Sequence, residues 1–458
     1  MRRFIFFTLV LFVVISLLAF DESFPFGMNN TVYGIFSDTT GKYDEFRRRY
    51  KKTMDFTAYG LGIGWWRAQN KFRWGDIQPN CTTWIWDDED SLVKWAGERE
   101  MHIIPVFGYT APWAHHSKLP DSKKDYWHLY PPDPSYWDNY KEYVKQLVER
   151  YDGDGERDYE GLIIPIKYWE FMNEPYSRKP FLGTPKQYVE MFDSTIVALK
   201  KADPEAKIGA PCLTGKFGNP LEWYYYDTID NIIDYIKFDS WEDAIDCIFN
   251  DSMIDTNNVD FVTFHIYDTP DNFMSVLRTL KEKVGKGKPV WITECGYKWY
   301  RWYHKYLNYT FCDTLSPDTI WIANTAFIYR VDTIDNISAT PEGQTKNYSK
   351  LLDSLVKFLS ECGNNKFMFF SMNVQSTEPE ISYDSIIAYS NCDPATLCTL
   401  WVNRLTVRYS RRSGSLSRKF SLLRRNLTPL PAYYTIFDKI RGSNINGLKG
   451  AYEPKNTH

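Results

Sequence analysis

The stretch of residues 164–175, IPIKYWEFMNEP, is the most informative part of the sequence. Its apolar run predicts a buried β-strand, and the Asn-Glu-Pro at its end predicts a turn at the tip of that strand. Seven further runs of this kind, bounded by Gly, Pro or Asn, occur at residues 31–36, 58–67, 102–109, 207–212, 259–267, 289–297 and 366–374. The chain therefore offers eight strand candidates.

Amphipathic stretches alternate with these strands and predict helices. Residues 135–151 follow Pro134, residues 186–202 follow Pro185, and the last such stretch begins at Pro431, which is the usual place of proline in the first turn of a helix. Strands that are each followed by a helix are typical of an α/β fold, and eight such units predict a (β/α)8 TIM barrel. An open, doubly wound sheet shows the same local pattern and is the alternative.

The composition limits the classes of ligand. The 458 residues include 17 Trp, 33 Tyr and 29 Phe, an aromatic share of 17%, and the formal net charge is −4. Aromatic faces stack on flat ligands such as sugar rings and bases. General binding of nucleic acid requires a basic excess that this chain lacks. Carbohydrate is therefore the first ligand class to consider, and no nucleic-acid partner is expected.

Two carboxylic acids lie at the ends of strand candidates. Glu174 follows the fourth candidate, and Glu294 lies near the end of the seventh, in PVWITECGY. In a closed barrel the tips of strands four and seven face each other across the C-terminal mouth, where barrel enzymes have their active sites. Glycoside hydrolysis uses such a pair, in which one acid protonates the leaving oxygen and the other, ionised, attacks or stabilises the cationic sugar.

The sequence around these glutamates resembles clan A of the glycoside hydrolases, barrel enzymes with catalytic glutamates at the ends of strands four and seven. The motifs WEFMNEP and WITECGY make the resemblance specific, and it extends from about Val32 to Ile440. Family thirty-nine, the xylosidase and iduronidase group, is the most similar, followed by the cellulase-like family five. The resemblance implies that Glu174 is the general acid/base, that Glu294 is the nucleophile and that Asn173 binds the sugar hydroxyl beside the reacting carbon.

This chemistry sets requirements for the neighbouring side chains. Glu174 needs a pKa raised by a dry site, whereas Glu294 needs hydrogen-bond donors that keep it ionised. Arg67 at the tip of strand two and Tyr267 on strand six are the nominated donors, and His265 lines the same wall. We expect the carboxyl groups to lie ~5 Å apart, which gives retention of configuration; a separation of ~9 Å would indicate inversion.

Each nominated side chain also has a purely structural interpretation. His265 could be a barrel histidine with satisfied hydrogen bonds, and Arg67 could be a buried ion-pair partner. Trp113 is a candidate for stacking on the sugar, although a single Trp in a chain with 17 is more often a packing residue. Glu170, four residues before Glu174, is expected to support the site rather than to react.

The N-terminus has the pattern of an export signal. Arg2 and Arg3 precede an apolar run over residues 4–20, which predicts a signal peptide at residues 1–20 and a secreted chain. An uncleaved membrane anchor is the alternative, because the apolar run is at the short limit for a membrane span. The catalytic barrel is then expected to occupy residues 27–443.

Glycosylation and disulfide bonds would fit an oxidising compartment. Seven Asn-x-Ser/Thr sequons occur, at Asn29, Asn80, Asn250, Asn308, Asn336, Asn347 and Asn426. Eight cysteines could pair, and only Cys392 with Cys398 is suggested by close spacing. Residues 444–458 form a polar tail without an evident core.

Two segments, residues 298–343 and 376–426, interrupt the alternation of strands and helices. Both follow a strand candidate, so they are expected to be long loops after strands seven and eight, at the C-terminal face. Residues 401–425 contain eight basic and no acidic side chains. This basic segment is either a docking surface for an anionic glycan or other anionic surface, or a solvated excursion.

The sequence is interpreted as a secreted, single-domain retaining glycoside hydrolase that acts on an O-glycosidic bond, expected to be β, in an oligo- or polysaccharide. No metal or organic cofactor is expected. Many clan members have a Trp on strand eight that forms the floor of the sugar subsite, whereas this chain has FMFF at residues 367–370. The identity of the sugar is therefore not predicted. A glycan-binding protein on a hydrolase scaffold and a transglycosylase are the alternatives. The sequence does not decide between endo and exo action or fix the oligomeric state.

Overall fold

A computed structural model gives the fold of the chain. It describes residues 22–29, 43–117, 119, 127–176, 181–215, 221–226, 233–250, 254–285, 287–296, 302–307, 319–322, 325–331, 341–370, 381–382, 386–389, 399–402, 406–407 and 431–442. The predicted signal segment, the tail after residue 443 and most of the basic segment 401–425 lie outside these residues. Within the described residues, no helix has the length and apolar character that crossing a membrane requires.

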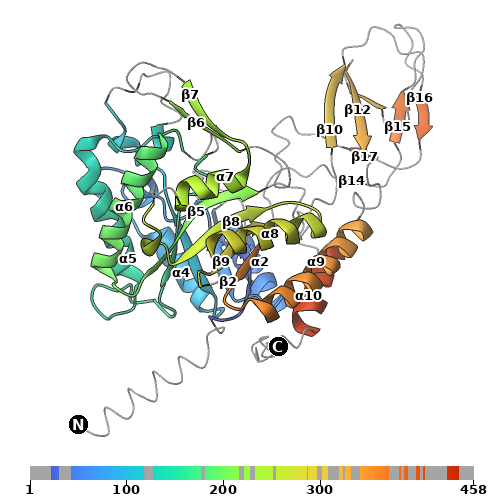
Figure 1. The fold of residues 1–458 in the computed structure, drawn as a ribbon. Helices are drawn as coiled ribbons and strands as arrows, with labels where there is room; N and C mark the ends of the chain where they lie inside the picture. The colour runs from blue at the N-terminus through green and yellow to red at the C-terminus, as the bar shows by residue number, and fades with distance from the viewer. Residues whose placement is uncertain are drawn as a thin grey trace.

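Eight parallel strands form a closed barrel (Figure 1), in the order β1-β13-β9-β8-β5-β4-β3-β2. Their bounds are β1 Phe26–Asn29, β2 Trp65–Ala68, β3 His102–Phe107, β4 Tyr168–Phe171, β5 Lys207–Gly215, β8 Phe261–Ile266, β9 Val290–Cys295 and β13 Lys366–Phe370. The first strand, β1, pairs with both β2 and β13, which closes the sheet. The predicted (β/α)8 fold is thus confirmed, and the open sheet is excluded.

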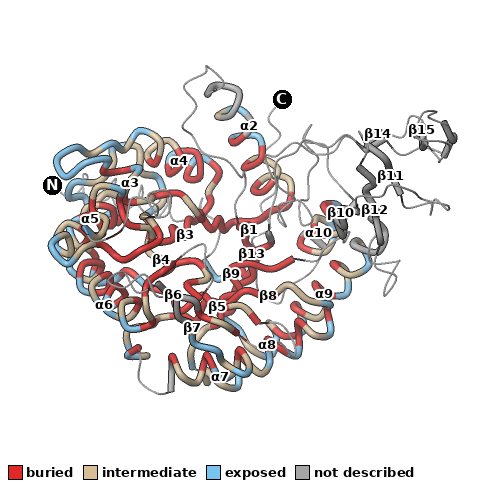
Figure 2. Tube along the Cα trace, turned by 90° about the horizontal axis from the view of Figure 1, so that it is seen from above, coloured by how far each residue is buried: buried red, intermediate tan, exposed pale blue. Residues whose placement is uncertain are grey.

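Helices surround the barrel, with buried strands at the centre and exposed helix faces outside (Figure 2). The α-helices are α2 Tyr43–Asp55, α3 Trp74–Ile77, α4 Asp87–Gly97, α5 Trp137–Tyr151, α6 Pro185–Ala202, α7 Trp241–Ile245, α8 Pro270–Val284, α9 Pro341–Glu361 and α10 Pro431–Gly442. Short 3-10 or π turns are η1 Phe56–Gly60, η2 Pro112–Ala114, η4 Pro134–Tyr136, η5 Asp246–Asn250 and η6 Thr256–Asn258. Helix α6 begins with a capping box between Thr184 and Gln187, as its predicted start at Pro185 suggests.

Strands outside the barrel follow three of its strands. An unpredicted hairpin of β6 Leu221–Tyr226 and β7 Ile233–Phe238 follows β5 and lies at the top of Figure 1. The long segment after β9 contains a three-stranded sheet, of β10 Trp302–Leu307, β11 Thr319–Ile322 and β12 Thr325–Val331. The segment after β13 contains the short pairs β14 Ile381–Ser382 with β17 Thr406–Val407, and β15 Ile386–Tyr389 with β16 Thr399–Val402. The two segments predicted as long loops therefore carry strands of their own.

The first barrel strand lies elsewhere than predicted. Residues 31–36 were expected to form it, but the strand is β1, Phe26–Asn29, and the prediction is wrong. Pro25 and Gly27 read as breakers of a strand. Gly27 is instead required by packing, because a Cβ there would lie 2.8 Å from the Cβ of Trp65 on the neighbouring strand.

Large side chains fill the N-terminal half of the barrel interior. Trp65, Ile104, Phe261, Trp291 and Met368 form one buried cluster, contributed by five different strands. The rings of Phe261 and Trp291 stack with centroids 3.9 Å apart. Such layers of bulky side chains make a barrel a packed core rather than a pore. They leave only the C-terminal mouth for polar chemistry.

The cysteines that the structure describes do not support a fully disulfide-bonded chain. Cys81, Cys212, Cys295 and Cys362 are free thiols, so not all of the eight cysteines that could pair do so. Cys392 and Cys398 lie outside the described residues. Cys295 is fully buried in the apolar core, and burial raises the pKa of its thiol, which disfavours the reactive thiolate.

The packed interior predicts that a methyl group at Gly209 destabilises the fold. A Cβ there would lie 2.1 Å from Cε2 of Phe261 and 2.6 Å from Cγ2 of Thr263. We expect Gly209→Ala to lower the free energy of unfolding by about 1–3 kcal/mol, as overpacked cores do. Urea unfolding measures the change. Gly363→Ala is the control, because a Cβ at Gly363 meets nothing within 4 Å, and equal stability of the two variants would contradict the packing described.

Candidate active site

The two predicted glutamates meet at the C-terminal mouth of the barrel. Glu174 lies three residues after the end of β4, and Glu294 lies in β9, in register with His265 on β8. One carboxylate oxygen of Glu174, one of Glu294 and a ring nitrogen of His265 all lie within 4.8 Å of one another. Distances of this order match the expected retaining separation of ~5 Å.

An unusual backbone aims Glu174 into the mouth. Met172 and Glu174 have φ angles of 57° and 45°, in the left-handed region that residues other than glycine rarely adopt. Asn173, between them, is 8% exposed. Such backbone strain persists only where the surrounding contacts determine it, and it gathers at functional sites. The Asn-Glu-Pro turn is therefore held by the contacts of its side chains.

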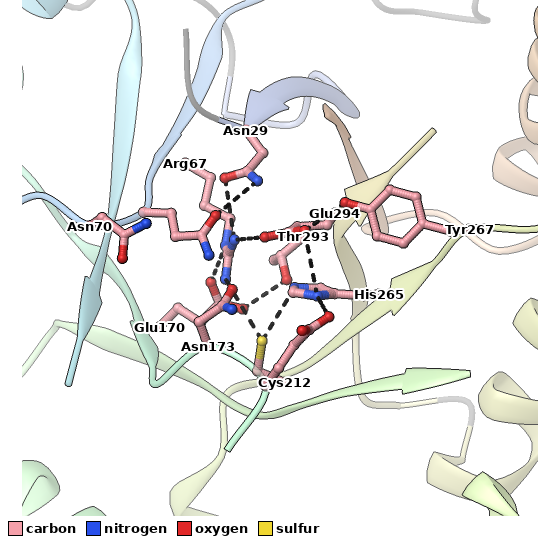
Figure 3. A network of polar contacts seen from close by, with 12 residues as sticks. Asn29, Arg67, Asn70, Glu170, Asn173, Cys212, His265, Tyr267, Thr293 and Glu294 are labelled. Carbon is pink, nitrogen blue, oxygen red and sulfur yellow. Dashed lines mark hydrogen bonds and ion pairs between the residues drawn. The ribbon is translucent and has the colours of Figure 1, made fainter. Parts of the chain in front are cut away.

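Arg67 is the centre of the polar network (Figure 3). Its side chain is fully buried, and Nη1 donates to Glu294 Oε1 at 2.8 Å and to Asn29 Oδ1 at 3.2 Å. Nη2 donates to Asn173 Oδ1 at 2.9 Å, and Nε pairs with Glu170. Arg67 thus combines its two predicted interpretations, since it is a donor to Glu294 and also a buried ion-pair partner.

Glu170 supports the site from the barrel interior, as expected. It is fully buried, and its two oxygens accept hydrogen bonds from Arg67 and, at 2.7 Å, from Thr293 Oγ1. Both partners are themselves buried. Glu170 therefore balances the charge of Arg67 and lies outside the carboxylate pair at the mouth.

His265 lies between the two carboxylates of the site. Its Nδ1 lies 2.8 Å from Glu174 Oε1 and 3.7 Å from Glu294 Oε2, and its Nε2 lies 3.3 Å from Cys212 Sγ. Burial would lower the pKa of His265, but Cys212, Glu294 and Glu174 around the ring outweigh it and raise the pKa well above 6.5. His265 is a barrel histidine with both nitrogens in contact, and it touches both carboxylates.

The pKa of Glu174 differs from expectation. A raised pKa was predicted for an acid in a dry site, and burial does act in that direction. The hydrogen bond and charge of His265 outweigh it, with smaller contributions from Tyr176 and Arg67, so the pKa lies below 4.5. The prediction is wrong for the resting enzyme, in which the proton resides on His265 and Glu174 is a carboxylate.

Tyr267 donates to the second oxygen of Glu294. Its hydroxyl lies 2.5 Å from Oε2, while Arg67 occupies Oε1. Burial, followed by the charge of Glu294, raises the pKa of Tyr267 well above 10, so the phenol stays protonated and remains a donor. Both oxygens of Glu294 thus accept a hydrogen bond, which fixes the orientation of the carboxylate.

Three residues of the network were missed by the sequence analysis. Cys212 has a φ of 56° where the pairing of β5 with β8 shifts register, and its Sγ lies 3.7 Å from Arg67 Nη2 as well as beside His265. Tyr176 hydrogen-bonds Glu174. Asn29, counted as a glycosylation sequon, is fully buried against Arg67 and so cannot accept a glycan in the folded chain. No signal in the sequence indicated Asn29, because the first strand was predicted at residues 31–36 and not at Phe26–Asn29.

The structure places Trp113 in an aromatic cluster beside the barrel. Its ring packs edge-to-face on Trp74 and Tyr136, with centroids 5.2 and 5.4 Å apart, and its Nε1 donates to the backbone oxygen of Gln78 at 2.7 Å. These contacts are those of a packing residue, and none of them involves the carboxylates. A role of Trp113 in sugar stacking stays a prediction.

Three groups of side chains in the described chain have donor atoms close enough for a cation. They are Glu174-His265-Glu294, Glu170-Cys212-His265 and Asp152-Asp154-Asp158. In the first two, the donor atoms already contact one another or Arg67, whose positive charge opposes a metal ion. In the third, the carboxylates accept hydrogen bonds from backbone amides of their own loop. We therefore interpret all three as hydrogen-bond networks.

Comparison with known proteins agrees with this geometry. Residues 134–330, which include both glutamates, match the family model described as the glycosyl hydrolase catalytic core. This part of the chain is thus similar to a glycosyl hydrolase catalytic core. A search of curated proteins finds no match.

Solved structures share the fold of this hydrolase core at low sequence identity. A family 39 enzyme from Xanthomonas axonopodis pv. citri has 13% identity and a TM-score of 0.51, over 92% of this chain and 66% of that one. A monomeric beta-xylosidase from Caulobacter crescentus CB15 has 14% identity and a TM-score of 0.50, over 91% and 68%. The chain thus spans about two thirds of the length of these structures. The resemblance to clan A, with family thirty-nine most similar, is confirmed at the level of fold.

The contact between His265 and Glu174 predicts a pH-dependent stability. A raised pKa of His265 stabilises the fold fully below 6.5 and less as pH rises through the folded value. A lowered pKa of Glu174 stabilises it above 4.5 and less as pH falls through the folded value. Both contributions are complete between these limits.

We therefore expect His265→Gln to lose about 1.5–3 kcal/mol of unfolding free energy at about pH 5.5, and less at about pH 9.5. Urea unfolding at both pH values measures this. His115→Gln is the control, because His115 stacks on Trp127 away from the network. A loss for His265→Gln that is the same at both pH values would show that the pair is not charged as described.

Proposed function

We propose that this chain is a retaining glycoside hydrolase that cleaves β-linked O-glycosidic bonds through a glycosyl-enzyme intermediate. The observation that carries the proposal is the close approach of the carboxylates of Glu174 and Glu294, with oxygens within 4.8 Å. Inverting enzymes need ~6.5–9.5 Å between the two groups, to leave room for water. The shorter spacing favours direct attack by one carboxylate.

Glu294 is the nucleophile in this proposal. Arg67 and Tyr267 each donate a hydrogen bond to one of its oxygens, so the carboxylate is oriented before the sugar arrives. A carboxylate oxygen attacks the anomeric carbon as the bond to the leaving oxygen breaks. The electron pair of that bond moves to the leaving oxygen, which takes a proton from Glu174.

The proton of Glu174 comes from His265. In the resting site the imidazolium lies 2.8 Å from Glu174 Oε1, so transfer along this contact converts Glu174 to the acid and leaves His265 neutral. In the second step Glu174 removes a proton from water, which attacks the same carbon and releases Glu294 as a carboxylate. His265 is thus the proton reservoir of the acid/base.

The first substrates to test are β-xylosides and β-glucosides. The beta-xylosidase from Caulobacter crescentus shares the fold, and its name gives the substrate class. On the strand where many clan members have a Trp, Phe369 of β13 is fully buried in the core and so does not stack on a sugar. We expect the sugar to be held mainly by hydrogen bonds from Asn173 and its neighbours.

We also propose that the chain is secreted by the signal at residues 1–20, with Arg2 and Arg3 ahead of the apolar run. The competing interpretation as a glycan-binding protein without turnover is disfavoured by the intact carboxylate pair. A substrate-binding protein has no need of a buried arginine that orients a nucleophile.

Substitution of the two glutamates tests the mechanism. We expect Glu294→Gln and Glu174→Ala each to lower kcat on aryl β-glycosides by about 10²–10⁴ or more, because each removes a group that acts only in the transition state. Azide is expected to rescue Glu174→Ala in part, since a small anion fits the space left and attacks the intermediate. Proton NMR of the first sugar released should show retained configuration.

The exposed Glu282→Gln on α8 is the matched control and should leave kcat unchanged. An inverted first product would overturn the double displacement. Full activity of Glu294→Gln would overturn the assignment of the nucleophile.

A further inference from the structure

A basic cleft lies between helices α2 and α4, on the outside of the barrel. It is open and has a volume of about 900 Å³. Six basic side chains line it, against two acidic ones, in a chain whose formal net charge is −4. The basic residues are Arg47, Arg48, Lys51, Lys52, Lys94 and Arg99. The cleft is therefore positively charged although the net charge of the whole chain is negative.

Helix periodicity explains why the charges face one another. On α2, Arg48 and Lys52 are four residues apart and share one face, while Tyr50 is fully buried and fixes the opposite face to the core. On α4, Lys94 projects to solvent next to Trp95, which packs inward. The two helix faces therefore hold their cations on opposite walls of one cleft.

The acids of the cleft are already occupied. Arg99 forms an ion pair with each of the two acidic side chains. Its Nε lies 2.7 Å from Asp55 Oδ1, and its Nη1 lies 3.7 Å from Glu98 Oε2. Among the described side chains, no acid forms an ion pair with Arg48, Lys52 or Lys94. These exposed cations repel one another at close range, which costs free energy unless an anion binds between them.

We propose that this basic cleft binds a polyanionic polysaccharide that carries sulfate or carboxylate groups along its length. Helix α4 has 11 residues and so spans roughly 16 Å, which suits several anionic groups in a row better than one small anion. The binding site is separate from the carboxylates, and the proposal does not depend on which bond they cleave.

Other polyanions fit the cleft less well. A lipid surface is flat, so it would contact the rims and leave the charges on the walls unpaired. Single-stranded nucleic acid gains affinity from bases that stack on open aromatic rings. Two aromatic residues line the cleft. Trp95 is only 6% exposed, and Lys51 Nζ lies 4.7 Å from the centroid of its ring. Tyr159 is half-buried, packs edge-to-face on Tyr151 and has the Arg150 guanidinium 5.6 Å from its ring centroid, so neither ring is an open platform. A sulfated or carboxylated glycan needs only the charges.

Calorimetric titration with a heparin octasaccharide and with an oligogalacturonate of the same length tests the proposal. The variant Lys52→Glu with Lys94→Glu reverses one charge on each wall, and both residues are exposed. The control, Lys186→Glu with Lys201→Glu, makes the same charge change on exposed positions of α6. We expect at least about tenfold weaker binding for the cleft variant, less than twofold for the control, and a wild-type affinity that falls as salt rises.

Equal weakening in both variants would overturn the site, because it would show only the effect of net charge. Absence of binding to either oligosaccharide by the wild type would overturn it too. Tighter binding to phosphatidylserine vesicles or to single-stranded DNA would overturn the choice of ligand.

Thermal unfolding and turnover of an aryl glycoside should be unchanged in the cleft variant. If the substitutions Lys52→Glu and Lys94→Glu impair folding, the double variant Lys52→Ala with Lys94→Ala is tested in their place.

Discussion

The site depends on the buried guanidinium of Arg67. It contacts side chains from β1, β4, β5 and β9 and the turn after β4, so one cation links the polar groups of five barrel strands including its own. Removing one member of such a buried ion pair costs about 3–5 kcal/mol, because the remaining charge loses its partner. The barrel mouth is therefore one electrostatic unit. The same contacts join the tips of these strands and orient the carboxylate of Glu294.

The charges of this unit explain how the site holds its proton. Arg67 and His265 supply two positive charges, against Glu170, Glu174 and Glu294. Two basic side chains thus face three acidic ones, which in the proposed mechanism favours the positive charge that develops on the sugar. Because His265 touches both reacting carboxylates, its proton stabilises the empty site and is also available to Glu174. A low pKa for Glu174 at rest is thus compatible with its role as an acid, provided that the proton moves only when the substrate displaces water.

The sequence predicted most strands because an apolar run bounded by breakers is a local property. Seven of the barrel strands lie within or close to the predicted runs. The prediction failed at β1, where Gly27 serves a packing contact with Trp65 that lies 38 positions further along the chain. The glutamates, Arg67, Tyr267 and His265 were found because they lie at strand tips. Cys212 and the low pKa of Glu174 were not, because both arise from contacts between strands distant in sequence, and neither leaves a local pattern.

The carboxylates and the basic cleft lie in different parts of the molecule. The carboxylates lie at the C-terminal ends of β4 and β9, whereas the basic cleft reaches Glu98 and Arg99, which precede the N-terminal end of β3. A polyanion held in the cleft is repelled by the negative cluster at the mouth. The cleft is therefore suited to anchor the enzyme on an anionic matrix, while a neutral glycan enters the mouth.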